Sequence, residues 1–569
     1  MQDVSIVMCG AAGQGIQTVE QLLVGIFKDA GYNVFATKEY ESRVRGGSNS
    51  TELRVAKERR AALVDRMDIF IPFDQAAVSH EVHRISGDTL VIADKDSFPA
   101  DGPADLPSPA VLLPFKEKAL EVGNRLYTNV VAAGAVTGLF GVDPEIGEAI
   151  IRRKFSAKGE DLVRENIQAL HAGNDLGSSL REKGHRFEVK CTKGVADELL
   201  LNGNQAIALG ALAGGCDFIS AYPMSPSTGV LEFLSQHQKD VPIVVDQAED
   251  EIAAINKAVA AWFMGARAIV STSGGGFDLM TEGLSMAGIM ESPLVIHLAQ
   301  RPGPATGLPT RTAQEDLNLA MYAGHGEFCR LVFAPGTITQ AFDLTRKAFD
   351  IADRLQIPVF VLTDQDFVDS YYNIPDLDLS ATPQDHFIET SEGYRRYELT
   401  EDGLSPRGVP GHGDGLVRLD SDEHDEHGHI TEDLRHMRPA MVEKRLHHRR
   451  ILMEEFLEPP TLQPGEAKNY VICWGSNHNV VKEAVELLDN KDLAMMHFHQ
   501  VHPLHADVRE LLSAAERTVL IENNATGQFA DVLKLQADHH VPEADRHLRY
   551  SGRPWSVEEV VSVLRKEGF

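Results

Sequence analysis

The chain has 569 residues, with 84 acidic against 54 basic side chains and a formal net charge of -30. Such an acidic chain is a poor partner for nucleic acid, which favours a basic protein face. Its 43% hydrophobic content is ordinary for a globular protein. The sequence has no apolar run long enough to span a bilayer and no signal-peptide pattern at its N-terminus, so we expect a cytoplasmic protein. Its length predicts about three domains.

The first predicted domain, residues 1–180, opens with a buried-type strand (4–8), a Gly-rich turn (10–15) and a helix that runs to Phe27. Turns of this kind bring backbone amides close to a phosphate or pyrophosphate. The second glycine is shifted from its place in the dinucleotide fingerprint, so a tight turn that binds nothing is an equally good interpretation. The residues proposed for anion binding, in this turn and in a later basic loop, are Gly13, Gln14, Gly15, Arg43, Arg45 and Gly46. Further strands are predicted at 67–72, 89–93 and 111–114.

A charged connector (175–193) leads to the central domain, residues 195–375, in which strands alternate with helices. This alternation predicts a doubly wound parallel sheet of the α/β class. In such sheets ligands bind outside the carboxyl ends of the strands. The predicted strands are 218–221, 241–246, 266–272, 293–298 and 359–362, and the predicted helices are 249–263, 277–290 and 338–355.

Loops at these strand ends carry the candidate site. They are Tyr222-Pro223-Met224-Ser225-Pro226-Ser227, Ser273-Gly274-Gly275-Gly276 and Gln300-Arg301-Pro302-Gly303-Pro304. Glu251 lies in the first turn of the helix at 249–263, whose later residues are mostly apolar or small. On spacing alone the simpler interpretation of Glu251 is that it complements the helix dipole, together with the two acidic residues before it. The simpler interpretation of Arg301 is a surface salt bridge.

Between residues 376 and 465 the periodicity breaks down, and we interpret this segment as an irregular arm that packs on partner chains. Its histidines at 424, 427 and 429 allow a metal site as an alternative. A third α/β region at 466–569 has predicted strands at 469–474, 495–499 and 518–521. After its last strand comes Glu522–Gln528, a turn with either a structural or a ligand-binding role.

In this order, the Tyr222–Ser227 loop, Glu251 with Ala253 and Ala254, Thr272-Ser273-Gly274 and Gln300–Pro304 resemble the pyrimidine-binding domain of the 2-oxoacid:ferredoxin oxidoreductases, most of all the alpha subunit of the 2-oxoglutarate enzymes. The N-terminal 180 residues resemble the gamma subunit, fused ahead of alpha, and residues 466–569 resemble the C-terminal domain of transketolase-type enzymes. The likeness implies three Rossmann-like or transketolase-like parallel-sheet domains, with a thiamine-diphosphate-binding fold in the middle. The family usually has Thr in place of Ser225 and Ser-Gly-Pro-Gly in place of Ser273–Gly276. Both changes keep a hydroxyl or a tight turn.

The resemblance implies a role for each candidate residue in a thiamine diphosphate site. Glu251 would form a hydrogen bond with N1′ of the pyrimidine and so stabilise the imino tautomer that removes the C2 proton. Ser225 would hold the carbonyl or carboxylate end of the substrate, and Arg301 would bind a carboxylate. The cofactor pocket would be completed by Tyr222, Pro223, Met224, Ser273 and Gly274.

The substrate that the resemblance favours is 2-oxoglutarate, whose second carboxylate needs its own cation because burying it unpaired costs free energy. Arg311, next to Thr310, is favoured for that role, with Arg43 and Arg45 as further candidates if their domain closes over the site. The alternative for Arg311 is an ion pair with Glu315 one helical turn later. Indolepyruvate, a branched-chain oxoacid and pyruvate stay open as substrates, and a non-catalytic nucleotide-binding scaffold is the alternative from another class.

The resemblance also implies partners. Coenzyme A is associated with the N-terminal domain in relatives. The diphosphate–magnesium motif has no good candidate, because Gly413-Asp414-Gly415 lies in the arm, and the five cysteines are never in Cys-x-x-Cys spacing. A beta subunit would therefore supply Mg2+, the diphosphate site and a [4Fe-4S] cluster that passes electrons to ferredoxin. We expect a dimer of alpha–beta heterodimers, weak thiamine diphosphate binding by this chain alone, and no metal site of its own.

Overall fold

The structure, a computed structural model, describes residues 2–11, 16–41 and 47–569. The chain divides into two compact units. Unit 1 comprises Met1–Leu201, Asp369–Asp376 and Ser556–Glu559. Unit 2 comprises Asn202–Val368, Leu377–Trp555 and Val560–Phe569. Among the described residues no helix is both long and apolar enough to cross a membrane.

Unit 1 is built on a mixed sheet with the strand order β6-β5-β4-β1-β3-β2-β14-β7. Strand β1 pairs in parallel with β4 and antiparallel with β3. The sheet is therefore mixed, whereas the sequence analysis expected parallel sheets. Its strands are β1 (Asp3–Ala11), β2 (Asn33–Glu39), β3 (Ser48–Ala56), β4 (Ile69–Pro72), β5 (Leu90–Asp94), β6 (Val111–Leu113), β7 (Leu199–Asn202) and β14 (Tyr371–Ile374).

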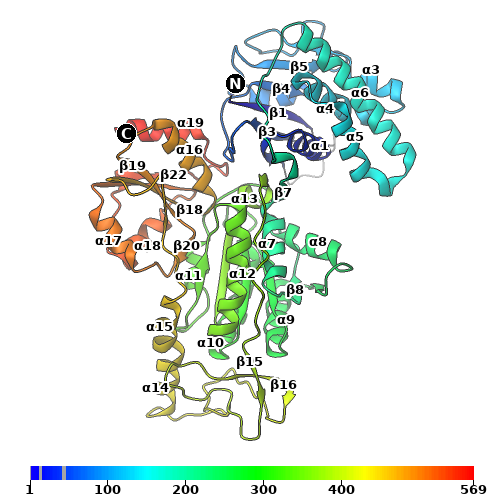
Figure 1. Cartoon of the computed structure of the whole chain (residues 1–569). Helices are drawn as coiled ribbons and strands as arrows, with labels where there is room; N and C mark the ends of the chain where they lie inside the picture. The colour runs from blue at the N-terminus through cyan, green and yellow to red at the C-terminus, as the bar shows by residue number, and fades with distance from the viewer. Residues whose placement is uncertain (1, 12–15, 42–46) are drawn as a thin grey trace. The chain divides into compact units, whose positions relative to one another are not determined.

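Helices cover this sheet, and one of them corrects a sequence prediction (Figure 1). Helix α6 runs from Glu160 to Glu182, so the first part of the predicted connector at 175–193 is helical. Gly177 and Leu180 are buried there, because small and apolar residues at helical spacing pack against α4 while the charged residues face solvent. The other helices are α1 (Ile16–Asp29), α2 (Gln75–Glu81), α3 (Phe115–Val122), α4 (Thr128–Phe140) and α5 (Pro144–Phe155).

The central sheet of unit 2 has the strand order β20-β12-β13-β11-β10-β8-β9. All pairs are parallel except β12 with β20. The predicted doubly wound parallel sheet is thus confirmed, and residues of β10, β11 and β13 are completely buried. The strands are β8 (Phe218–Ala221), β9 (Val244–Gln247), β10 (Ala268–Thr272), β11 (Leu294–Gln300), β12 (Leu331–Phe333), β13 (Pro358–Asp364) and β20 (Gln500–His502).

The helices of this sheet pack in pairs, α7 against α12 and α9 against α10 (Figure 1). Helix α12 begins and ends where the sequence predicted, because its apolar stripe is strongly one-sided. The helices are α7 (Gly203–Ala213), α8 (Thr228–His237), α9 (Glu251–Phe263), α10 (Gly274–Ile289), α11 (Leu317–Tyr322), α12 (Ile338–Leu355) and α13 (Gln365–Asp369).

The arm is only partly irregular. It holds a small parallel pair, β15 (Phe387–Thr390) with β16 (Arg407–Gly413). It then holds a helical stretch that the sequence analysis did not predict, formed by α14 (Met437–Val442), a π-helical segment (Glu443–His448) and α15 (Arg449–Glu454).

The C-terminal part of unit 2 forms a second sheet, β17-β19-β18-β21-β22. Strand β18 starts at Asn469, as predicted. The elements are β17 (Thr461–Gln463), β18 (Asn469–Trp474), α16 (His478–Leu488), β19 (Leu493–Phe498), α17 (Asp507–Ala514), β21 (Arg517–Glu522), α18 (Gln528–Ala537), β22 (Arg546–Leu548) and α19 (Val557–Lys566).

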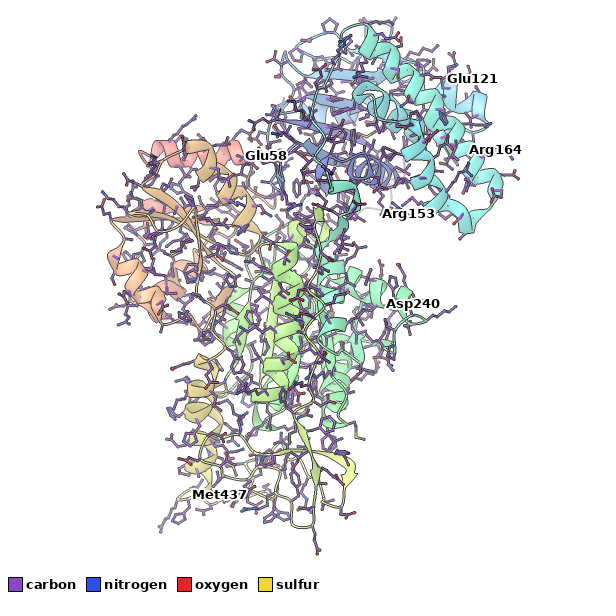
Figure 2. All side chains as sticks on the ribbon, viewed as in Figure 1. Glu58, Glu121, Arg153, Arg164, Asp240 and Met437 are labelled. Atoms are coloured by element: carbon purple, nitrogen blue, oxygen red, sulfur yellow. The ribbon has the colours of Figure 1, made fainter. Side chains whose placement is uncertain are left out.

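The charged residues labelled in Figure 2 are exposed on the unit to which they belong. Glu121, Arg153 and Arg164 project from helices or helix ends of unit 1, and Asp240 projects from the turn after α8 in unit 2. Charges of both signs on the helices are what a solvated protein surface requires.

Candidate active site

The candidate site lies at the carboxyl ends of β8, β10 and β11, where α10 begins. Gly274–Gly276 was predicted as a turn before a helix at 277, and this prediction was wrong. Helix α10 starts at Gly274, with Ser273 as an N-cap residue whose side chain makes no capping hydrogen bond. In this first helical turn, side chains approach Gly274 and Gly276 too closely for a Cβ atom.

Glu251 is the first of these side chains. It is the first residue of α9 and is 3% exposed. A Cβ at Gly276 would lie 2.6 Å from Glu251 Oε1 and 2.3 Å from Thr272 Oγ1. The capping interaction of α9 belongs to Asp250, whose carboxylate accepts a hydrogen bond from Ala253 N at 2.8 Å. Glu251 is therefore buried against α10. The residue that complements the dipole of α9 from an exposed position is its neighbour Asp250.

Asp316 is the second side chain, and the sequence analysis did not single it out. A Cβ at Gly274 would lie 2.5 Å from Asp316 Oδ2. Asp316 precedes α11 but makes no side-chain capping hydrogen bond to it. Burial, with help from Glu315 and Asp278 and against the charge of Arg301, raises the pKa of Asp316 to about 7. A carboxyl group that is half-protonated near neutral pH thus faces the start of α10.

Arg301 follows β11 and is 9% exposed, which corrects the surface salt bridge considered for it. Its Nη1 donates a hydrogen bond to the Ser225 carbonyl at 2.8 Å. No ion pair within 4.0 Å joins Arg301 to a carboxylate in the part of the chain that the structure describes, and its Nε has no hydrogen-bond partner there. Burial lowers the pKa of Arg301, and Asp316 opposes this effect. The fold therefore holds an unneutralised guanidinium next to Ser225.

Four buried polar atoms around this helix start have no hydrogen-bond partner among the described residues. Buried polar groups in proteins are nearly always hydrogen-bonded, so such a cluster is characteristic of a ligand site. Three of them belong to residues at the first turn of α10, and the fourth belongs to Arg301, whose charge acts on Asp316. They are Glu251 Oε1, Ser273 Oγ, Arg301 Nε and Asp316 Oδ2.

The Tyr222–Ser227 loop closes beside this cluster. Ser227 Oγ donates to the Met224 carbonyl at 2.8 Å, which shapes the turn. Pro223, Met224 and Ser225 are half-buried, whereas Tyr222 is 40% exposed and stands at the edge.

The second predicted cation lies in the loop between β11 and α11. Thr310 is buried, and Arg311 Nη1 donates to its carbonyl at 3.3 Å. Arg311 packs beside Gly552. Glu315, the alternative partner of Arg311, accepts a hydrogen bond from Gly303 N at 2.8 Å.

The Glu522–Gln528 turn has a structural role, because it clamps this loop. Gln314 N donates to the Asn523 carbonyl at 2.7 Å. Gln528 Nε2 donates to the Glu315 carbonyl at 2.7 Å, and Gln528 Oε1 accepts from Asn318 N at 2.9 Å. The amide of Gln528 thus brackets Asp316 in the chain.

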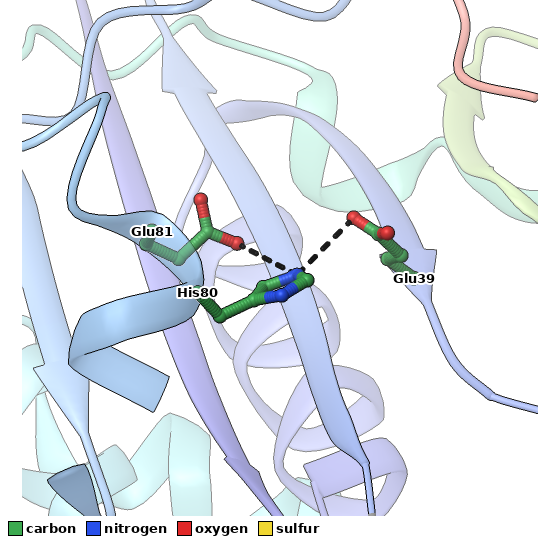
Figure 3. Close-up of side chains that lie close together, drawn as sticks. All are labelled: Glu39, His80 and Glu81. Atoms are coloured by element: carbon green, nitrogen blue, oxygen red, sulfur yellow. Dashed lines mark ion pairs between the residues drawn. The ribbon is translucent and has the colours of Figure 1, made fainter. Parts of the chain in front are cut away.

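In unit 1, the predicted anion-binding residues Gly13, Gln14, Gly15, Arg43, Arg45 and Gly46 lie outside the described residues. Unit 1 also holds the one group of described side chains that could offer three ligand atoms to a metal (Figure 3). His80 Nε2 lies 3.8 Å from Glu39 Oε2 and 3.7 Å from Glu81 Oε1. Arg84 already neutralises Glu81 at 3.2 Å, so we assign no metal to this group.

The histidines of the arm do not form such a group among the described residues. His424 is fully buried and stacks on Tyr397, with ring centroids 3.7 Å apart. Burial lowers the pKa of His424. It is a core residue of the arm.

Comparison with known proteins identifies the family. The description "Pyruvate flavodoxin/ferredoxin oxidoreductase, thiamine diP-bdg" matches residues 209–444, and "Pyruvate ferredoxin/flavodoxin oxidoreductase" matches residues 5–176. The 2-oxoacid:ferredoxin oxidoreductase subunit alpha of a Sulfolobus species is 30% identical, over 99% of this chain and 96% of that protein. This chain belongs to the 2-oxoacid:ferredoxin oxidoreductase alpha subunits.

Other members of this family are also similar to this chain along most or all of its length. The 2-oxoglutarate oxidoreductase subunit KorA of Mycobacterium tuberculosis is 27% identical, over 94% of this chain and 87% of that protein. Among solved structures, a 2-oxoglutarate:ferredoxin oxidoreductase from Magnetococcus marinus, with 2-oxoglutarate, coenzyme A and succinyl-CoA bound, is 28% identical over all of both chains with a TM-score of 0.91. The family is thiamine-diphosphate-dependent, and the site at α10 lies within the segment that matches its thiamine-binding description.

Proposed function

We propose that this chain is the thiamine-binding subunit of an enzyme that oxidatively decarboxylates 2-oxoglutarate with coenzyme A, giving succinyl-CoA and CO2. The observation that carries this proposal is the buried Glu251 carboxylate, which has an unpartnered oxygen at the head of α9. Relatives named for 2-oxoglutarate, and the structural neighbour with 2-oxoglutarate and coenzyme A bound, support the choice of substrates.

The residues around α10 fit the pyrimidine half of thiamine diphosphate. When bound, the cofactor supplies the carbon nucleophile and the electron sink for decarboxylation. Glu251 would accept a hydrogen bond at N1′ from within an apolar wall, where the bond is strengthened by the exclusion of water. Gly276 gives this carboxylate the room it occupies. Ser273 Oγ is a further buried group with capacity for a cofactor hydrogen bond.

The substrate would enter between the Tyr222–Ser227 loop and Arg301. The Ser225 carbonyl fixes one end of the Arg301 guanidinium, and Arg301 Nε keeps its capacity to donate. A guanidinium held in this way is pre-oriented to donate hydrogen bonds to a substrate carboxylate. For the second carboxylate of 2-oxoglutarate we propose Arg311, which lies in the loop clamped by Gln528 and Asn523.

We further propose that a partner beta subunit contributes Mg2+, the diphosphate site and the iron–sulfur cluster that passes electrons to ferredoxin. Four of the five cysteines, Cys9, Cys216, Cys329 and Cys473, are buried far apart in sequence, and the fifth is Cys191. Burial raises the pKa of Cys216 to about 12, which disfavours the thiolate form that a cluster needs.

A substrate panel on the enzyme assembled with its partner tests the assignment. With coenzyme A and a one-electron dye, 2-oxoglutarate should give the highest kcat/KM. Arg311→Ala should lower this value at least tenfold for 2-oxoglutarate and spare 2-oxobutyrate, which lacks the second carboxylate. Arg43→Ala and Arg45→Ala complete the comparison. A wild type that prefers 2-oxobutyrate or an aryl pyruvate would contradict the dicarboxylate assignment.

A further inference from the structure

Asp316 is the one group of the candidate site that a simple carboxylate-binding role does not explain. An acidic side chain beside the cation that receives a substrate carboxylate weakens that cation when it is ionised. Nevertheless, several hydrogen bonds hold the backbone of Asp316 and its neighbours in this position. Gln300 Oε1 accepts a hydrogen bond from Asp316 N at 3.0 Å, and Gln528 brackets the residue from both sides.

A structural role for the Asp316 carboxylate finds no support in its contacts. It does not cap α11, and Oδ2 is buried without a hydrogen-bond donor among the described residues. In the described part of the chain Asp316 feels the charge of Arg301 but forms no ion pair with it within 4.0 Å. Gly274 accommodates the carboxylate where any other residue would displace it. The carboxyl group therefore points into the site at the start of α10.

We propose that Asp316 is a further residue of the substrate site: its ionised carboxylate competes with the 2-oxoacid carboxylate for the charge of Arg301, and it takes up a proton from solvent when the substrate binds. This inference rests on the proposed function of Arg301. Bound carboxylate and ionised Asp316 would place two negative charges in the field of one buried guanidinium, without a second cation among the described residues to balance them. Protonation of Asp316 removes one of these charges, so the neutral acid is the form that accompanies bound substrate.

The charged groups that face Asp316 set the pH range of this effect. Glu315 in its own loop and Asp278 on α10 favour the neutral acid, and Arg301 after β11 favours the anion. Together with burial they leave the pKa of Asp316 at about 7, above the ordinary value of 3.8. The anion therefore predominates above pH 7, where substrate binding must bring in a proton, and the neutral acid predominates below it.

The test is calorimetric binding of oxamate, a non-reacting 2-oxoacid analogue, to the assembled enzyme in buffers of different ionisation heat. For the wild type we expect uptake of about one proton per oxamate at pH 8, and a Kd about tenfold higher at pH 8 than at pH 6. Asp316→Asn should bind without proton uptake, with a Kd at pH 8 close to that of the wild type at pH 6. Glu282→Gln, which removes an exposed carboxylate further along α10, is the matched control and should keep the uptake.

Oxamate binding that takes up no proton in the wild type, or uptake that persists in Asp316→Asn, would overturn the inference. So would a wild type that binds no oxamate at either pH. Because the readout is proton uptake and not turnover, the two proposals fail separately. Loss of this effect in an enzyme that still oxidises 2-oxoacids refutes only the role of Asp316, whereas an enzyme that oxidises none refutes the proposed function.

Discussion

Gly276 and Gly274 show how single missing Cβ atoms shape the site. Each lets a carboxyl group approach the first turn of α10 more closely than any other residue would allow, Glu251 at one position and Asp316 at the other. Gly275 between them has no such neighbour, since its Cβ would meet the Ala305 carbonyl at an ordinary 3.4 Å. The three glycines are thus not equivalent.

Gly276→Ala should therefore displace Glu251 and lower turnover about a hundredfold, while the protein stays folded. The new methyl group would have to share space with Glu251 Oε1 and Thr272 Oγ1. Gly275→Ala is the control, and it should keep near-normal activity because alanine favours a helix over glycine. The checks are kcat/KM and the thermal midpoint of both variants. Equal activity of the two variants would show that Glu251 does not need its observed position.

Sequence reasoning proposed Glu251, Ser225 and Arg301 because each stands in a motif directly after a strand or at a helix start. The structure brings Ser225 and Arg301 into contact and buries Glu251. Asp316 was missed because its place depends on a long loop whose path is fixed by Gln528 from a distant part of the chain. No local pattern encodes such a clamp.

At the scale of elements, the arm is held to the central sheet by buried charges. Glu291, between α10 and β11, is 2% exposed and accepts hydrogen bonds from Lys444 Nζ and Arg449 Nη2, each at 2.5 Å. Burial alone would raise the pKa of Glu291, but these two cations hold it far below its usual range. The helical stretch of the arm is fixed by this network.

Glu291→Gln should destabilise unit 2 by roughly 3–5 kcal/mol, because it leaves two buried cations without their counter-charge. We expect a lower thermal midpoint and faster proteolysis of the arm. Since the pKa of Glu291 is depressed, its stabilisation is present above the ordinary value of 4.5 and is lost as the pH falls below it. Glu282→Gln on the exposed face of α10 is the control. Equal melting of the two variants at pH 7 would argue against the network.

Most strands and one long helix of the central sheet were predictable from the sequence. The start of α10 and the helical stretch of the arm were not, for physical reasons. Strands β8, β10, β11 and β13 and helix α12 follow from apolar runs and periodicity. The start of α10 was missed because three glycines indicate a turn, whereas here they form the first turn of a helix. The helical stretch of the arm was missed because it buries charged residues where an apolar stripe is expected: Lys444 and Arg445 in its π-helical segment and Arg449 at the start of α15.

At the scale of the whole molecule, the chain is an alpha subunit of a thiamine-diphosphate-dependent family. Its central sheet carries a buried carboxylate, a pre-oriented arginine and a loop clamped by the C-terminal sheet. The family match covers this chain and its relative almost end to end. Sequence could predict this architecture because the motifs stand at strand ends in a parallel sheet, where ligands bind whatever the details of the loops.

The most direct test of this account is turnover by Glu251→Gln in the enzyme assembled with its partner subunit, with bound thiamine diphosphate quantified in the same sample. Gln keeps the shape of the side chain but replaces the anionic acceptor at N1′ with a neutral amide. We predict cofactor content close to that of the wild type and at least a hundredfold loss of dye reduction with 2-oxoglutarate and coenzyme A. Near-normal turnover at full cofactor content would contradict the role of Glu251, and with it the site proposed at the start of α10.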